Sequence, residues 1–206
     1  MIVPTPGAAF TSASDGDARR DFAVRSAVSA RLGIGSDWAT VNQVHGAKVL
    51  EATHGGSLGD ADALFTSVAG LGLAVFTADC AGVVVQADRG VGVAHAGWRG
   101  AAEGVVTRLL EAMDGAGLTA MRASLGPSIG PCCFEVGPEV ASRFSGFVAK
   151  TEWGTDSVDL WSAVTAQLGG LPVDDLRHCT RHEPDAFSHR RDGTESRMAA
   201  IGWWPA

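Results

Sequence analysis

Three residues with the side chains that zinc prefers, His45, Cys80 and His95, stand at the ends or turns of predicted strands. Neutral imidazole and thiolate are good Zn²⁺ ligands, and three protein ligands leave a fourth coordination position open for water. A bound water whose pKa falls toward about 7 can attack an amidine-like carbon such as C6 of adenine. Because the spacing has no CxxC or HExxH signature, a buried cysteine beside two hydrogen-bonded histidines is the alternative.

A predicted hairpin explains how two of these residues meet. The apolar segments 83–87 and 91–94 have the composition of buried strands, and Asp88-Arg89-Gly90 between them is a turn signal. Folding the segments back on one another puts His95 opposite a residue two or three positions from Cys80. We therefore expect both side chains to reach one ion.

Two neighbours of these residues are candidates for substrate contact and proton transfer. Gly97 leads from a strand into a predicted helix start, where free N–H groups could meet an anion, and Arg99 would add a charge-assisted contact. A solvated arginine is the alternative. Asp79 could act as a general acid or base, or could orient a histidine, unless it is only a turn carboxylate.

Further cysteines, histidines and arginines have both functional and structural interpretations. The adjacent Arg190 and Arg191 could face a phosphate or a ribose, or could be solvated. Cys132 and Cys133 follow a Gly/Pro loop, where one could be a nucleophile, although buried thiols are commoner. The segment 178–182, with His178, Cys179 and His182, could suggest a second metal site, but we favour a structural role for it.

Composition limits the classes of protein. The chain has 206 residues, is 46% hydrophobic and 19% charged, and carries a net charge of -7, which favours a globular protein and argues against nucleic-acid binding. No run approaches the ~18–20 apolar residues of a membrane span. The N-terminus has no signal-peptide pattern, so we expect a cytoplasmic protein with reduced cysteines.

Strand-like and helix-like segments alternate without a strict βαβ pattern, which predicts an α+β (or α/β-type) fold of mixed β-sheets flanked by helices in a single domain, residues 1–206. Periodicity and turn residues predict helices over Ala18–Leu32, Trp98–Met113 and Glu139–Val148, strands over Ala39–Val49, Leu71–Phe76 and Arg122–Leu125, and a Gly-rich loop over 54–63.

Five short motifs, in the expected order from about residue 40 to the end, resemble the YfiH, or multicopper polyphenol oxidase (laccase-like), family. They are Asn42-Gln43-Val44-His45-Gly46, Thr77-Ala78-Asp79-Cys80, His95-Ala96-Gly97-Trp98-Arg99-Gly100, Gly126-Pro127-Ser128-Ile129-Gly130-Pro131 and Phe187-Ser188-His189-Arg190-Arg191-Asp192-Gly193. Two departures stand out. The N-terminal segment, expected to help wall the pocket, is shorter than usual, and Glu195-Ser196 replaces Thr-Gly, which puts a negative charge near the expected phosphate site.

The resemblance implies one zinc ion and a purine nucleoside phosphorylase, with adenosine deaminase and methylthioadenosine phosphorylase activity, acting on a small-molecule nucleoside and phosphate. Editing of peptidoglycan precursors and an inactive metal-binding domain are alternatives. Copper oxidation is less favoured, because a laccase needs several copper ions and many imidazoles and the chain has six histidines. The expected roles are metal ligation by His45, Cys80 and His95, catalysis by Cys80, Asp79 and Arg99, and substrate binding by Arg99, Arg190, Arg191 and Gly97.

Overall fold

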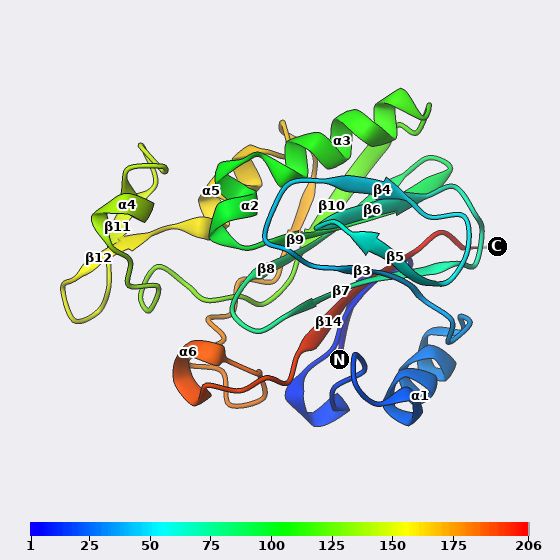
Figure 1. The fold of residues 1–206 in the computed structure, drawn as a ribbon, viewed down its shortest axis with the longest axis horizontal. Coiled ribbons are helices and arrows are strands. Elements are labelled where there is room, and N and C mark those ends of the chain that lie inside the picture. The colour runs from blue at the N-terminus through cyan, green and yellow to red at the C-terminus, as the bar shows by residue number, and fades with distance from the viewer. Residues whose placement is uncertain (206) are drawn as a thin grey trace.

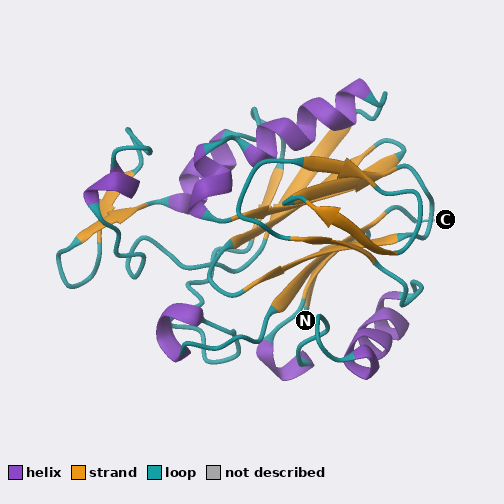
Figure 2. Cartoon of the chain, in the orientation of Figure 1, coloured by secondary structure: helices purple, strands orange, loops and turns teal. Residues whose placement is uncertain are grey.

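Two six-stranded sheets lie face to face in the computed structural model, which describes residues 1–205 (Figures 1 and 2). The first sheet has the order β1 (Ile2–Thr5), β2 (Ala8–Phe10), β14 (Met198–Trp203), β7 (Gly72–Thr77), β3 (Ala39–Asn42), β5 (Gly56–Asp60). The second has the order β13 (Val173–Asp175), β10 (Ala120–Leu125), β8 (Ala81–Ala87), β9 (Gly90–Ala96), β6 (Ala63–Thr66), β4 (Val49–Glu51).

Helices cover the outer faces of both sheets. Figure 1 shows α3 on one side of the sandwich and α1 on the other, with β11, β12 and α4 projecting from one end. The remaining elements are a 3-10 turn (Ala13–Asp15), α1 (Phe22–Leu32), α2 (Trp98–Ala102), α3 (Val105–Gly115), α4 (Pro138–Ala141), α5 (Leu160–Ala166), α6 (His189–Asp192) and the hairpin of β11 (Val148–Lys150) with β12 (Asp156–Val158). Both sheets contain parallel and antiparallel pairs, so the predicted α+β class with mixed sheets is confirmed. No helix within residues 1–205 has the length and apolar character needed to span a membrane.

The central strands bury both of their faces. In β7, Leu73 and Val75 pack between the two sheets, whereas Ala74 and Phe76 pack toward α1. In β8 the alternation is the same, with Val84 between the sheets and its neighbours under α3. Strands that are covered on both faces consist of continuous apolar runs, and such runs are what predicted these strands from the sequence.

The predicted hairpin is confirmed. β8 pairs with β9 in antiparallel register through a two-residue connection, and Gly82 lies opposite His95. Because Cys80 directly precedes β8, its side chain and that of His95 come to the same end of the hairpin. Strand pairing alone therefore brings together two residues that are distant in sequence.

Several predicted elements are shorter or broken. The strand expected over 39–49 stops at Asn42, and the next strand begins at Val49 in the other sheet, so His45 lies in the loop between them. The helix expected over 139–148 ends at Ala141, where the chain turns toward β11. The Gly-rich segment 54–63 is not only a loop, because it contains β5, which pairs with β3.

Local capping and backbone geometry correct the bounds of two helices. α1 begins at Phe22 rather than Ala18, because the Asp21 side chain accepts hydrogen bonds from the N–H groups of the first turn. The helix expected over 98–113 divides into α2 and α3 at Gly104, whose φ of 77° lies in the left-handed region.

We expect alanine at Gly104 to destabilise the fold by about 1–2 kcal/mol, because a left-handed backbone penalises any Cβ. Alanine at Gly115, within α3, should instead stabilise it by up to about 1 kcal/mol, since an added Cβ there meets nothing within 4 Å. Urea unfolding of the two variants measures both changes. Changes of the same sign would contradict the assigned helix break.

Candidate active site

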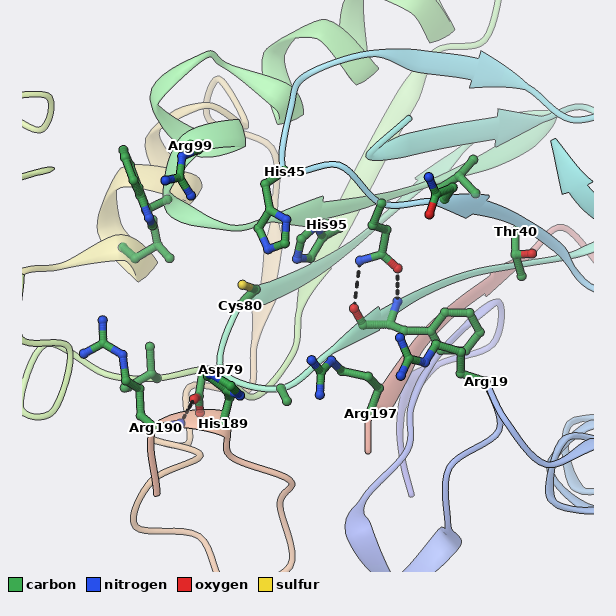
Figure 3. Close-up of a pocket in the computed structure, with 18 of the residues that line it drawn as sticks. Arg19, Thr40, His45, Asp79, Cys80, His95, Arg99, His189, Arg190 and Arg197 are labelled. Carbon is green, nitrogen blue, oxygen red and sulfur yellow. Dashed lines mark hydrogen bonds between the residues drawn. The ribbon is translucent and has the colours of Figure 1, made fainter. Parts of the chain in front are cut away.

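Three potential metal ligands converge at one end of the second sheet. The ligand atoms of His45, Cys80 and His95 all lie within 4.8 Å of one another, and the two imidazole rings meet edge to face with centroids 4.9 Å apart (Figure 3). His45 comes from the loop after β3, Cys80 from the bend before β8 and His95 from the end of β9. The structure thus brings together the three residues expected to share an ion.

Backbone strain is concentrated at this site. His45 at φ 62° and Asp79 at φ 84° are the two non-glycine residues with left-handed φ in the described part of the chain, and both line the same pocket. Such conformations persist only where surrounding contacts fix them. The Gln43 side chain supplies part of this restraint, because it donates to the Phe76 carbonyl and accepts from the Phe76 N–H, both at 2.8 Å.

Asp62 is the residue that organises the ligands, and sequence reasoning missed it. Its fully buried carboxylate accepts the N–H groups of Val44, His45 and Gly46 at 3.2, 3.0 and 2.7 Å, and the Nδ1–H of His95 at 2.8 Å. The bond to Nδ1 leaves the Nε2 of His95 available to a metal. The signal in the sequence is an aspartate between two alanines directly before β6, in the segment that its composition predicts to be a Gly-rich loop.

Charge within the cluster favours a metal-binding state of the thiol. Burial raises the pKa of the Cys80 thiol, but the charges and hydrogen bonds of His95 and His45 outweigh this and lower it to about 6. Burial lowers the pKa of His95, whereas the Cys80 thiolate and Asp62 raise it to about 9. The raised pKa of His95 means that its ring must lose a proton when an ion binds, and the thiolate and imidazole donors that result are the set that Zn²⁺ and related soft cations bind.

Gly97 provides the space for this cluster. A Cβ on Gly97 would lie 3.1 Å from Cδ2 of His45, 3.2 Å from Sγ of Cys80 and 3.6 Å from Cε1 of His95. Gly97 was expected to present an N–H group to an anion at a helix start. Its position against all three ligands indicates a different role, and α2 has only five residues, which leaves little helix dipole.

The cluster forms part of the wall of a cavity of about 560 Å³, large enough for a small organic substrate. Apolar and aromatic side chains line much of it, among them Phe76, Trp98, Ile129, Phe134 and Leu160. Five arginines also line it, namely Arg19, Arg25, Arg99, Arg190 and Arg197. None of the five forms a salt bridge with a carboxylate anywhere in residues 1–205, whereas six other arginines do.

The two expected arginines of the C-terminal motif differ in their surroundings. Arg190 lines the cavity, with its guanidinium 5.2 Å from the ring of Phe134 and Nη1 donating to the Glu135 carbonyl at 2.9 Å. Arg191 does not line it, because its guanidinium donates to Asp192 and to the carbonyls of the segment 180–186. The structure therefore brings Arg190, but not Arg191, to the cavity.

Asp79 lines the cavity, but its carboxylate contacts no histidine of the cluster and instead fixes the C-terminal segment. Its carboxylate accepts the Thr180 hydroxyl at 2.6 Å and the Arg190 N–H at 2.7 Å, so it anchors the C-terminal segment to the bend that carries Cys80 (Figure 3). Both oxygens are engaged, which argues against proton transfer by Asp79. Glu195, expected near the phosphate site, does not line the cavity, and its exposed carboxylate pairs with Arg20 at 2.6 Å.

Comparison with known proteins places this chain in a recognised family. The family model described as multi-copper polyphenol oxidoreductase laccase matches residues 11–205. A Streptomyces griseus protein named purine nucleoside phosphorylase is 40% identical over 179 residues, which cover 79% of this chain and 72% of the relative. One of the same name from Mycobacterium tuberculosis is 38% identical over 194 residues, 87% of this chain and 77% of the relative.

Solved structures show the same fold. YlmD from Geobacillus stearothermophilus superposes with a TM-score of 0.85 at 28% identity, covering 98% of this chain and 94% of that one. The Bacillus licheniformis protein YfiH gives a TM-score of 0.78 at 25% identity, covering 90% and 82%. The YlmD match therefore extends over nearly the whole chain, including the N-terminal segment.

We expect Asp62→Asn to reduce the free energy of unfolding by about 3 kcal/mol, because an amide cannot accept every hydrogen bond that the buried carboxylate accepts. Asp60→Asn, two residues away at an exposed position, should cost less than about 1 kcal/mol. Chemical denaturation at neutral pH compares the two. Equal effects would contradict the organising role of Asp62.

The effect of Asp62→Asn on the free energy of unfolding should also depend on pH. Burial raises the pKa of Asp62, but hydrogen bonds from His95 and the backbone outweigh it and lower the pKa below its usual value. A carboxyl with a lowered folded-state pKa contributes stability above its unfolded pKa of about 3.9 and loses it as the pH falls further. The difference between wild type and Asp62→Asn should therefore shrink below about pH 4, and a constant difference would count against the assignment.

Proposed function

The chain belongs to the multi-copper polyphenol oxidoreductase laccase family, and on that premise we propose that it is a zinc-dependent purine nucleoside phosphorylase formed by one YfiH-like domain over residues 1–206. The names of its relatives support this activity. The main structural support for the proposal is the cavity. Five arginines without carboxylate partners line it together with the His-Cys-His cluster. In a chain with a net charge of -7, five guanidinium groups without a carboxylate salt bridge around one cavity favour an anionic co-substrate.

His45, Cys80 and His95 would hold the zinc ion. Their donor types, the orientation of His95 by Asp62 and the space left by Gly97 fit such an ion. A bound zinc ion would supply a Lewis acid able to polarise an oxygen or nitrogen of the substrate. Copper chemistry of the laccase kind finds less support, because residues 1–205 contain two metal-like clusters with one or two histidines each rather than an imidazole-rich multinuclear site.

Arg99 is the residue that we assign to phosphate. Its guanidinium lies 4.3 Å from the centroid of the Trp98 ring, and among the described residues it makes no hydrogen bond or salt bridge. Stacking on an indole fixes the planar fork and leaves its N–H groups available, which suits bidentate binding of a phosphate oxygen pair. Arg190, on the other side of the cluster in Figure 3, would bind a second anionic or hydroxyl group.

The apolar walls would hold the base. Phe76 and Phe134 offer aromatic faces in the cavity, and Ile129 and Leu160 exclude water from it. Phosphorolysis would then transfer the ribosyl group from the base nitrogen to a phosphate oxygen, releasing free base and ribose 1-phosphate. The role of this chain's residues is to place phosphate and ribose carbon in contact.

The direct test is incubation of the purified protein with inosine or adenosine, with and without phosphate. Phosphate-dependent formation of free base and ribose 1-phosphate supports the proposal. Conversion of adenosine to inosine without phosphate would establish deamination instead, and no reaction with either nucleoside would contradict the proposal. Oxidation of a phenol by copper-loaded protein would support the laccase alternative.

We expect Arg99→Ala to lower kcat/KM for phosphorolysis by about 30- to 150-fold, which corresponds to about 2–3 kcal/mol of lost transition-state binding. Arg99→Lys should recover only part, because an ammonium lacks the planar fork. The matched control is Arg143→Ala, an exposed arginine outside the cavity, which should leave kcat/KM unchanged. Equal values for all these proteins would mean that Arg99 is a surface arginine.

A second expectation concerns the ion. Cys80→Ala should lose one metal equivalent relative to wild type, together with phosphorolysis, because it removes the thiolate. Arg99→Ala should keep the full metal content, since the guanidinium is not a ligand. Elemental analysis after extensive dialysis checks both proteins, and full retention by Cys80→Ala would contradict the ligand assignment.

A further inference from the structure

Four soft metal ligands meet at a second point, apart from the cavity. The ligand atoms of Cys132, Cys133, Cys179 and His182 all lie within 4.8 Å of one another, and Sγ of Cys133 is 3.1 Å from Nε2 of His182. None of the four lines the cavity. The sequence had suggested His178, Cys179 and His182 as a group, and the structure replaces His178 with the two adjacent cysteines.

Two short segments deliver these ligands, and the backbone fixes both. Cys132 and Cys133 lie in a turn closed by the Cys133 N–H on the Gly130 carbonyl at 3.0 Å. Cys179 and His182 lie in another turn, closed by the His182 N–H on the Cys179 carbonyl at 2.9 Å. An isolated parallel β-bridge between the backbones of Ser128 and Cys179 joins the two segments, so the backbone already brings the four ligands together.

We propose that these four side chains form a second metal site, a closed Cys3His centre that binds Zn²⁺ for a structural purpose. Three thiolates and one imidazole are a complete tetrahedral ligand set for structural zinc. Zn–S bonds of about 2.3 Å place tetrahedral sulfur atoms about 3.8 Å apart. The ligand atoms are at most 4.8 Å apart, so the widest separation needs to close by no more than about 1 Å to reach that spacing.

The surroundings hold the second of these turns in place. The guanidinium of Arg191, which also pairs with Asp192 at 2.8 Å, donates to the carbonyls of Thr180 and Glu183 at 3.0 and 2.9 Å, and so fixes the turn that carries two ligands. The Glu152 carboxylate, 3.3 Å from Nε2 of His182, is half exposed and can turn to solvent when that nitrogen binds the ion.

The position of the site gives it a role. The first segment leads directly into Phe134 and follows Ile129, which both line the cavity. The second continues to His189 and Arg190, which line it from the C-terminal side. A metal ion that crosslinks the two segments would therefore hold two walls of the cavity at a fixed separation, although it lies outside the cavity.

Metal counting on the full-length chain tests the proposal. Protein purified with reductant, loaded with zinc and dialysed should contain about two equivalents per chain. Cys80→Ala should retain one, and Cys133→Ser/Cys179→Ser should also retain one. His182→Ala should bind the second ion more weakly, whereas His178→Ala, an exposed neighbour outside the cluster, should keep both.

The absorption spectrum of bound cobalt is a second measurement, which depends neither on enzymatic activity nor on the folding of the Cys133→Ser/Cys179→Ser variant. Co²⁺ added to Cys80→Ala should give strong thiolate-to-metal charge-transfer absorption, because the remaining site has three thiolates. The proposal would be overturned if the wild type bound only one zinc equivalent and Cys80→Ala bound none. So would a weak cobalt spectrum, or a disulfide among Cys132, Cys133 and Cys179 found by mass spectrometry of the reductant-purified protein.

Discussion

The buried carboxylate of Asp62 is the interaction on which the site depends. It accepts three successive N–H groups of the loop that carries His45 and, at the same time, the Nδ1–H of His95. One group therefore sets the position of one ligand and the ring orientation of another. A carboxylate with no exposed surface is tolerated because every hydrogen bond it needs is present, and removal of any donor would leave a buried charge without its partners.

The sheets supply the other constraint. The register of the hairpin β8–β9 fixes Cys80 relative to His95, and the hairpin is rigid because its strands are packed between α3 and the first sheet. Left-handed backbone at His45 and Asp79 then turns side chains into the cavity. The strain is local, whereas the contacts that oppose it extend through two sheets, so the strained geometry can persist.

The sequence was informative where a local pattern decides the structure. Continuous apolar runs identified β8 and β9, and the turn between them predicted the meeting of Cys80 and His95. It was uninformative where a long-range polar contact decides. Nothing near Asp62 in the sequence shows that its carboxylate meets His95, and nothing near Arg191 shows that it is taken up by backbone carbonyls. The predicted bounds of the helix over 98–113 were wrong for a different reason. A single left-handed residue, Gly104, interrupts a sequence pattern that is otherwise helical.

The distribution of charge connects fold and chemistry. The arginines outside the cavity are largely neutralised by carboxylates, while those that line it are not, so the molecule concentrates positive potential beside the proposed metal centre. The most direct test is a crystal structure of zinc-loaded protein with inorganic phosphate, with anomalous data collected above the zinc edge. We expect an anomalous peak between His45, Cys80 and His95, with Nδ1 of His95 still donating its hydrogen bond to Asp62 and with phosphate in contact with Arg99. No peak at that position, or coordination of His95 through Nδ1, would contradict this expectation.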